Sequence, residues 1–195
     1  LLIATLVTGP VHAQDPGLQS ERDKVSYMVG MDVSRSVAPA LPDMDMASFE
    51  RALSNGLAGG KPLLDEAAAK QTSQALMTRI DARKSGKNAA PIDNAKVGLL
   101  IGTSIGRSLL DISSEIDVPM LLRGLKDATT PGATTRLSEA EANALRASFS
   151  SRLTAAKAAQ RIAIAQAALK GEEDFLARNK TVKGVFSTPS GLQYM

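Results

Sequence analysis

Apolar residues recur at helical spacing in two stretches of the chain, which begin at Asp23 and Ala95. The first reads DKVSYMVGMDVSRS and the second AKVGLLIGTSIGRS, and the two align without a gap at an offset of 72 residues. This spacing predicts one amphipathic helix in each stretch. The predicted packing faces consist of Val25, Met28, Val29 and Val33 in the first helix and Val97, Leu100, Ile101 and Ile105 in the second.

A glycine interrupts both predicted helices at the same place, Gly30 in one and Gly102 in the other. Glycine inside a helix costs ~1 kcal/mol relative to alanine, so a compensating interaction is expected. We expect the backbone of a crossing helix to approach closely at each glycine, and both residues therefore belong to the predicted packing face.

The internal repeat continues through a second predicted helix, which starts after Asp45 in one copy and after Asp117 in the other. Both aspartates precede an apolar run in the same way, so we interpret them as N-caps rather than as catalytic acids. The apolar stripes of these helices consist of Met46, Phe49, Leu53 and Leu57, and of Val118, Leu121, Leu122 and Leu125.

The third helix differs between the two copies. In the first copy it covers residues 65–84 and ends at the linker KSGKNAAP. In the second copy Ser138 and Glu141 have the spacing of a capping box, and helical composition continues to Arg178. A helix of ~40 residues would be ~60 Å long, so we expect it to reach another domain or to pack on a second chain. Segment 142–171 contains bases and no acid, which fits a solvated face better than attraction to acidic lipid or an acidic client.

These elements predict an all-α fold of two tandem three-helix units, with a very long last helix and a short extended C-terminal tail. The tail, STPSGLQYM, has the pattern of a starting strand, and without a sheet to join it is expected to fray. The predicted boundaries are 1–13 for a signal-peptide remnant, 20–87 for the first helical unit, 88–95 for a linker, 96–180 for the second unit with its long helix, and 181–195 for a terminal junction.

Residues 1–13 have the pattern of a secretory signal peptide. An apolar run, LLIATLV, is followed by a Gly-Pro break and by VHA, whose small or apolar outer residues resemble a signal-peptidase site. The alternative is a buried N-terminal strand. His12 is the only histidine and would leave with the signal peptide, so it receives no catalytic or metal role. This interpretation predicts a periplasmic, secreted or outer-envelope protein.

Composition limits the chemistry. Of the 195 residues 3% are aromatic, and there is no tryptophan or cysteine. The core must therefore be aliphatic, and disulfides, thiolate chemistry and cysteine metal sites are excluded. A formal charge of +3 is too small to indicate nucleic-acid binding. Without a phosphate-binding loop or a nucleophile–histidine pair, the sequence predicts no catalytic residue, no metal site and no cofactor.

Three stretches carry a resemblance to a known family: DKVSYMVGMDVSRS, DMDMASFERALSNGLAGGKPLLDEAAAK and FLARNKTVKGVFSTPSGLQY. They resemble the N-terminal domain of bacterial FKBP-type peptidyl-prolyl isomerases of the macrophage infectivity potentiator and FkpA group. In that family a short helical domain forms an intertwined dimer, and a long helix leads to a catalytic domain whose first strand begins near SGLQY. The resemblance implies a dimerisation and chaperone-like substrate-holding module of a protein-folding enzyme.

The chain departs from this pattern in two respects. The helical domain occurs twice, and the aromatic pocket of the isomerase domain has no counterpart before Met195, so no catalytic residue is carried over. The alternatives are a fragment of a complete, active isomerase and a stand-alone envelope adaptor. The predicted partners are a second copy of the chain, or the two repeats paired within one chain, together with unfolded or nascent periplasmic proteins. Neither nucleic acid nor a membrane span after signal removal is expected.

Overall fold

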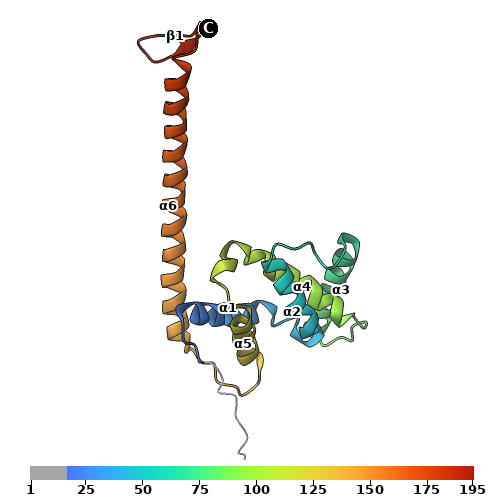
Figure 1. The fold of residues 1–195 in the computed structure, drawn as a ribbon. Helices are drawn as coiled ribbons and strands as arrows, with labels where there is room; N and C mark the ends of the chain where they lie inside the picture. Colours follow the sequence, from blue (N-terminus) through green and yellow to red (C-terminus); the bar gives the residue numbers. More distant parts are fainter. Residues whose placement is uncertain (1–16) are drawn as a thin grey trace, which may run out of the picture. The chain divides into compact units, whose positions relative to one another are not determined.

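The computed structural model describes residues 17–195, so the predicted signal peptide and His12 lie outside the described residues. The prediction of an all-helical fold with a very long last helix is confirmed (Figure 1). In chain order the elements are α1 (Glu21–Val37), η1 (Leu41–Asp43), α2 (Met46–Leu57), α3 (Glu66–Lys84), α4 (Asn94–Ser108), η2 (Leu110–Glu115), α5 (Val118–Thr129), α6 (Glu139–Asn179), β1 (Phe186–Ser187) and β2 (Gln193–Tyr194). Helix α4 begins inside the segment that was expected to be a linker.

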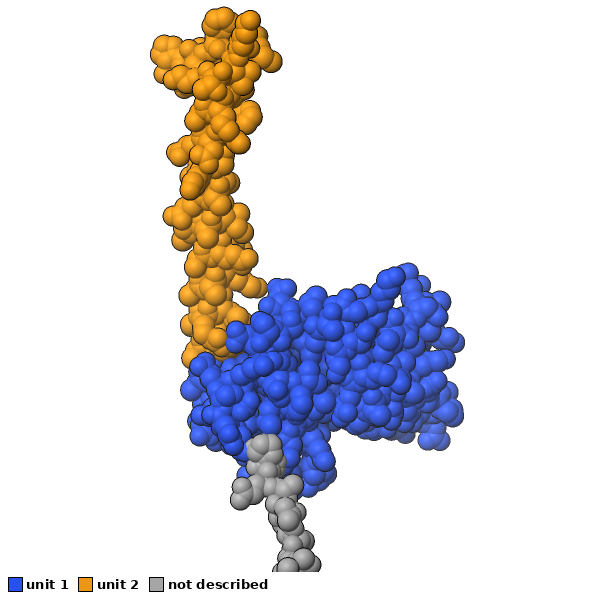
Figure 2. All heavy atoms as spheres, in the orientation of Figure 1, with its two compact units in different colours: residues 1–145 blue, residues 146–195 orange. Residues whose placement is uncertain are grey.

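The chain divides into two compact units, residues 1–145 and residues 146–195 (Figure 2). The boundary falls within α6, so the first unit holds α1 to α5 and the first turns of α6. The second unit holds the rest of α6 and the two short strands. Copy one of the repeat supplies α1, α2 and α3, and copy two supplies α4, α5 and α6.

The first unit is built by an exchange of helices between the two copies. Helix α1 of copy one packs along α5 of copy two, and α4 of copy two packs along α2 of copy one (Figure 1). Polar contacts join both pairs: the amide of Asp45 donates to the carbonyl of Asn94 at 3.0 Å, and the amide of Asp117 donates to Ser26 Oγ at 2.7 Å. The two repeats therefore pair with each other within one chain.

Two equivalent glycine contacts hold the exchanged pairs together. A Cβ at Gly30 would lie 2.0 Å from the carbonyl oxygen of Leu121, and a Cβ at Gly102 would lie 2.3 Å from the carbonyl oxygen of Phe49. Phe49 and Leu121 occupy the same position in the repeat, so one contact is made twice with the copies interchanged. The sequence analysis predicted that a crossing helix approaches closely at both glycines, and this is confirmed. The close approach explains why glycine, which has a poor helix propensity, occupies these two helix positions.

Helix α4 makes two further contacts of this kind, one turn to either side of Gly102. A Cβ at Gly98 would lie 2.4 Å from the carbonyl oxygen of Asp45, and a Cβ at Gly106 would lie 2.6 Å from that of Leu53. Gly98, Gly102 and Gly106 are four residues apart in the sequence. Residues four apart share a helix face, so this spacing indicates that one face of α4 is lined by glycine.

Helix α3 is fastened to the first unit through a buried carboxylate. Asp43, which is 2% exposed, accepts hydrogen bonds from Arg79 Nε at 2.5 Å and from the guanidinium of Arg83. Burial by itself raises the pKa of the Asp43 carboxyl, but the hydrogen bonds and charges of the two arginines outweigh it, and the net pKa is lowered. The helix ends at Lys84, and Gly86, just beyond its C-cap, has a φ of 65° that suits glycine.

The C-terminal tail forms an antiparallel hairpin, and the expectation that it frays is wrong. Phe186 pairs with Tyr194, and their stacked rings have centroids 5.8 Å apart. Gln193 ties the hairpin to the end of α6, because its side-chain amide donates to the carbonyl of Leu176 at 2.8 Å and accepts from Asn179 Nδ2 at 2.8 Å. These bonds satisfy groups that a helix end otherwise leaves open, so the tail is held without a larger sheet.

We predict that Gly30→Ala and Gly102→Ala each lower the free energy of unfolding by ~1–3 kcal/mol, because the new Cβ overpacks against backbone. The loss should appear even though alanine is the better helix former by ~1 kcal/mol. Urea denaturation followed by circular dichroism measures it. Gly171→Ala is the matched control, since a Cβ there meets nothing within 4 Å. Equal stability of the Gly30 and Gly171 variants would contradict the contact.

We predict that Asp43→Asn lowers the free energy of unfolding by ~2 kcal/mol near neutral pH, because two charge-assisted hydrogen bonds are lost. The folded-state pKa of Asp43 is lowered, so its contribution is complete above the ordinary aspartate pKa of ~4 and disappears as the pH falls through the folded-state value. The difference between wild type and variant should therefore shrink on acidification. A difference that is constant from neutral to acidic pH would refute this account.

Candidate functional site

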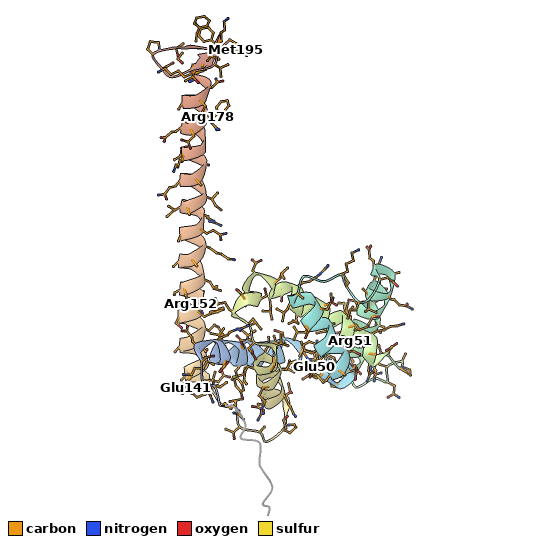
Figure 3. The ribbon with its side chains drawn as sticks, in the orientation of Figure 1. Glu50, Arg51, Glu141, Arg152, Arg178 and Met195 are labelled. Carbon is orange, nitrogen blue, oxygen red and sulfur yellow. The ribbon has the colours of Figure 1, made fainter. Side chains whose placement is uncertain are left out.

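A groove of about 700 Å³ lies in the first unit between α2 and α5, the two second helices of the repeat. Its apolar lining consists of Leu41, Met46, Pro119, Met120 and Leu122. Its polar lining consists of Glu50, Arg123, Lys126, Thr129 and Arg136. Figure 3 labels Glu50 on α2, where it marks one wall.

The groove is formed by the flanks of helices whose other faces are buried. Phe49 and Leu53 of α2 are 0% exposed, as are Leu121 and Leu125 of α5, because these residues pack on the exchanged helices. The neighbouring position on α5, Leu122, lies about 100° around the helix and is only half-buried. The helix exchange therefore fixes both walls while leaving apolar side chains accessible between them.

The two predicted aspartate caps begin these walls. Asp45 Oδ2 accepts a hydrogen bond from the amide of Ser48 at 2.9 Å, and Asp117 Oδ1 accepts one from the amide of Met120 at 3.1 Å. Hydrogen bonds from the side chain and amide of Ser48 lower the pKa of the Asp45 carboxyl. Both carboxylates therefore act on helix ends, which is the role that the sequence indicated.

Ser138 begins α6 in the same manner. Its amide and hydroxyl donate to Glu141 Oε2 at 2.8 and 2.7 Å, and its Oγ accepts from the amide of Glu141 at 3.2 Å. The hydrogen bonds from Ser138 lower the pKa of the Glu141 carboxyl. This reciprocal pair is a capping box.

The basic rim of the groove is organised by one carboxylate on α5. Asp127 lies 3.1 Å from Arg123 Nε and 3.6 Å from Arg136 Nε, and it accepts a hydrogen bond from the hydroxyl of Tyr27 at 2.9 Å. The Tyr27 hydroxyl in turn accepts from the amide of Arg136 at 2.9 Å, and burial raises its pKa. A side chain from α1 thus helps to fix two cations at the groove, while Lys126 stays exposed.

The predicted packing faces of α1 and α4 are covered unequally. On α1, Gly30 is buried, and the apolar residues of the face, Val25, Met28, Val29 and Val33, are at most 7% exposed. On α4, Val97 and Gly102 are buried, whereas Leu100, Ile101 and Ile105 are only half-buried. Two hollows of about 440 and 410 Å³ remain beside α3, and Leu100 lines both. The α3 side chains there include the small Ala69 and Ser73, which leave this face partly open.

Of the five methionines of copy one, three lie in the core, one lines the groove, and Met77 on α3 is exposed outside both. Met28, Met31 and Met44 are 2%, 3% and 7% exposed, so they fill the interior. Met46 is half-buried and lines the groove opposite Met120 of copy two. Met46 and Met120 therefore give the groove flexible thioether side chains, which fit irregular apolar partners.

The groove combines an apolar floor with a mostly basic rim. Its lining includes no histidine, cysteine, serine or aromatic residue. Within residues 17–195 no cluster of three His, Cys, Asp or Glu side chains is placed to hold a metal ion. In the same residues no helix is both long enough and apolar enough to cross a bilayer.

Comparison with known families agrees with this architecture. A family model described as the domain amino terminal to FKBP-type peptidyl-prolyl isomerase matches the chain twice, over residues 22–96 and 94–195. The chain belongs to this family. The duplicated FKBP amino-terminal domain inferred from the repeat is thereby confirmed, and the groove lies where the two matched domains meet. No curated protein and no solved structure matches the chain.

Proposed function

We propose that this chain is the substrate-holding helical module of a periplasmic or outer-envelope FKBP-type peptidyl-prolyl isomerase. The observation that carries the proposal is the accessible groove between α2 and α5, which exists because two FKBP amino-terminal domains exchange helices. The resemblance described above implies such an exchange between two chains. Here one chain provides both halves, so the groove forms without a second chain.

The substrate class that fits the groove is a non-native segment with apolar side chains and a nearby acid. Met46, Met120 and Leu122 offer an apolar floor without a fixed shape. Arg123, Lys126 and Arg136 outnumber the one acid of the lining, Glu50. An apolar segment would gain from leaving water, and an acidic residue beside it would be attracted to the rim.

The proposed location rests on residues 1–13, whose sequence resembles a cleaved secretory signal. The absence of cysteine is compatible with an oxidising compartment. Cell fractionation, with N-terminal sequencing of the mature chain, tests both the compartment and the cleavage after Ala13.

We predict that the chain suppresses aggregation of a chemically denatured reporter protein and that Met46→Glu with Met120→Glu removes at least about half of this effect. The two new carboxylates would place charge on the apolar floor that the client must desolvate. Light scattering during refolding measures the effect. The matched control is Met77→Glu on α3, since Met77 is 64% exposed and lies outside the groove. Equal suppression by all three proteins would contradict a holding role for the groove.

We also predict that the groove does not catalyse prolyl isomerisation. Stabilising a twisted prolyl amide against a barrier of ~18–20 kcal/mol requires a desolvated pocket, and this groove is open and has no aromatic lining. The purified chain should leave the isomerisation rate of a proline-containing tetrapeptide at the uncatalysed value. A rate that rises with protein concentration and falls in the Met46→Glu, Met120→Glu variant would assign catalysis to the groove.

A further inference from the structure

The second unit carries a row of exposed apolar side chains along α6. Ile162 and Leu169 are 59% and 61% exposed, and they lie seven residues apart, about 20° around the helix from one another. Ala155, Ala158 and Ala165 share this face at alternating spacings of three and four. Apolar residues repeated in this way form the seam of a coiled coil. We call these five residues the α6 seam.

The seam is not needed to make α6 helical. The surrounding segment is rich in alanine, the residue with the highest helix propensity, and α6 is much longer than the ~12–15 residues below which an isolated helix is marginal in water. Ile162 and Leu169 lie one heptad apart with Ala165 between them on the same face, so they give α6 a continuous apolar strip of the kind that a second helix covers.

Charge along α6 selects the direction of a partner helix. Residues 142–171 contain five bases and no acid, and residues 172–174 are Glu-Glu-Asp. A parallel pair of such helices would place base beside base. An antiparallel pair places the acidic segment of each helix beside the basic segment of the other.

We propose that α6 pairs with α6 of a second copy of this chain as an antiparallel coiled coil, centred between Ala163 and Ile164. In this register Ile162 packs on Ala165 of the second copy, and Leu169 packs on Ala158 of the second copy. A large side chain thus meets a small one in each layer, which allows the two backbones to approach. The same register sets Arg152 beside Glu173 of the second copy at the flank of the seam, on both sides of the two-fold axis.

The same observations disfavour an acidic membrane surface as the occupant. A helix that lies on a membrane gathers its apolar residues on one face and its bases around that face. On α6, Ile164 is 62% exposed and lies about 200° around the helix from Ile162. Arg146 and Lys157 lie on the side of Ile164, whereas Arg152 and Lys170 lie beside the seam. The bases thus lie on several sides of the helix instead of bordering a single apolar face.

This pairing is independent of the groove and of the helix exchange. The faces of α1 and α5 already cover each other within one chain, so a second copy binds through a surface that the first unit does not use. The exchanged pair is complete within one chain, and the α6 seam remains as a self-complementary face. Two copies that pair through this face around a two-fold axis form a closed dimer.

The full chain contains no cysteine, so single-cysteine variants test the pairing without other changes. Ala165→Cys lies near the proposed axis and should form an intermolecular disulfide under mild oxidation. Ala155→Cys should not, because its two copies would be about 25 Å apart in the antiparallel register. Cross-linking of both variants with equal yield would indicate a parallel pair, and cross-linking of neither would overturn the proposal.

Sedimentation equilibrium supplies the second test. Ile162→Gln should raise the dissociation constant of the dimer about tenfold or more, and Ile164→Gln should leave it unchanged, although the two variants have the same composition and comparable exposure. Circular dichroism at the same concentration shows whether each variant keeps its helix content. An equal effect of the two variants, or a wild-type chain that stays monomeric at high micromolar concentration, would refute the pairing.

Charge reversal distinguishes the proposed register from other contacts. Arg152→Glu and Glu173→Arg should each weaken the dimer, because like charges then face each other, and the double variant should restore it to the wild-type dissociation constant. Failure of the double variant to restore pairing would overturn the register. Binding to anionic phospholipid vesicles by a chain that is monomeric in solution would assign α6 to a membrane surface and overturn the proposal itself.

Discussion

The structure depends on a contact that only glycine permits, the approach of one helix backbone to the carbonyl groups of another. At Gly30 and Gly102 an added Cβ would lie 2.0 and 2.3 Å from a carbonyl oxygen of the crossing helix. Each glycine is in the first helix of one copy and its partner carbonyl is in the second helix of the other copy, so both contacts join the two copies. Together they make the repeat an exchanged pair rather than two separate bundles.

The exchange places two equivalent helices, α2 and α5, on either side of the groove. The third helices, α3 and α6, take no part in the exchange, and they differ in length and in their contacts. Copy one anchors α3 with Arg79 and Arg83 on the buried Asp43 and ends it at Lys84, shortly before Gly86. Copy two has Ala156 at the position that corresponds to Arg83, and its helix runs on to Asn179. The third helix of copy one is therefore short and held by ion pairs, whereas the third helix of copy two is long and carries the α6 seam.

Local features were predicted well because their causes are local. Asp45, Asp117 and Ser138 cap helices through hydrogen bonds to residues three positions away, so their sequence context suffices to identify them. The sequence predicted that both glycines contact another helix, because glycine is unfavourable inside a helix and its occurrence at the same position of both copies indicates that packing offsets this cost. It did not predict which helix each glycine contacts. The groove was not predictable, since its lining comes from η1, α2, α5 and Arg136, which no local pattern connects. The hairpin was missed because Gln193 bonds to residues of α6 that lie outside its own segment.

The sequence by itself determined the number of copies, the helices and their ends, the aliphatic core and the family, because periodicity, capping and repetition are properties of short segments. Only the tertiary structure decided which helix packs on which. Each first helix offers the same apolar face and glycine, and a second helix of either copy supplies an equivalent carbonyl, so the choice depends on how the chain folds back. That choice also decided that Met46 and Met120 meet in one groove and that Leu100 and Ile101 stay half-buried while their counterparts on α1 are covered.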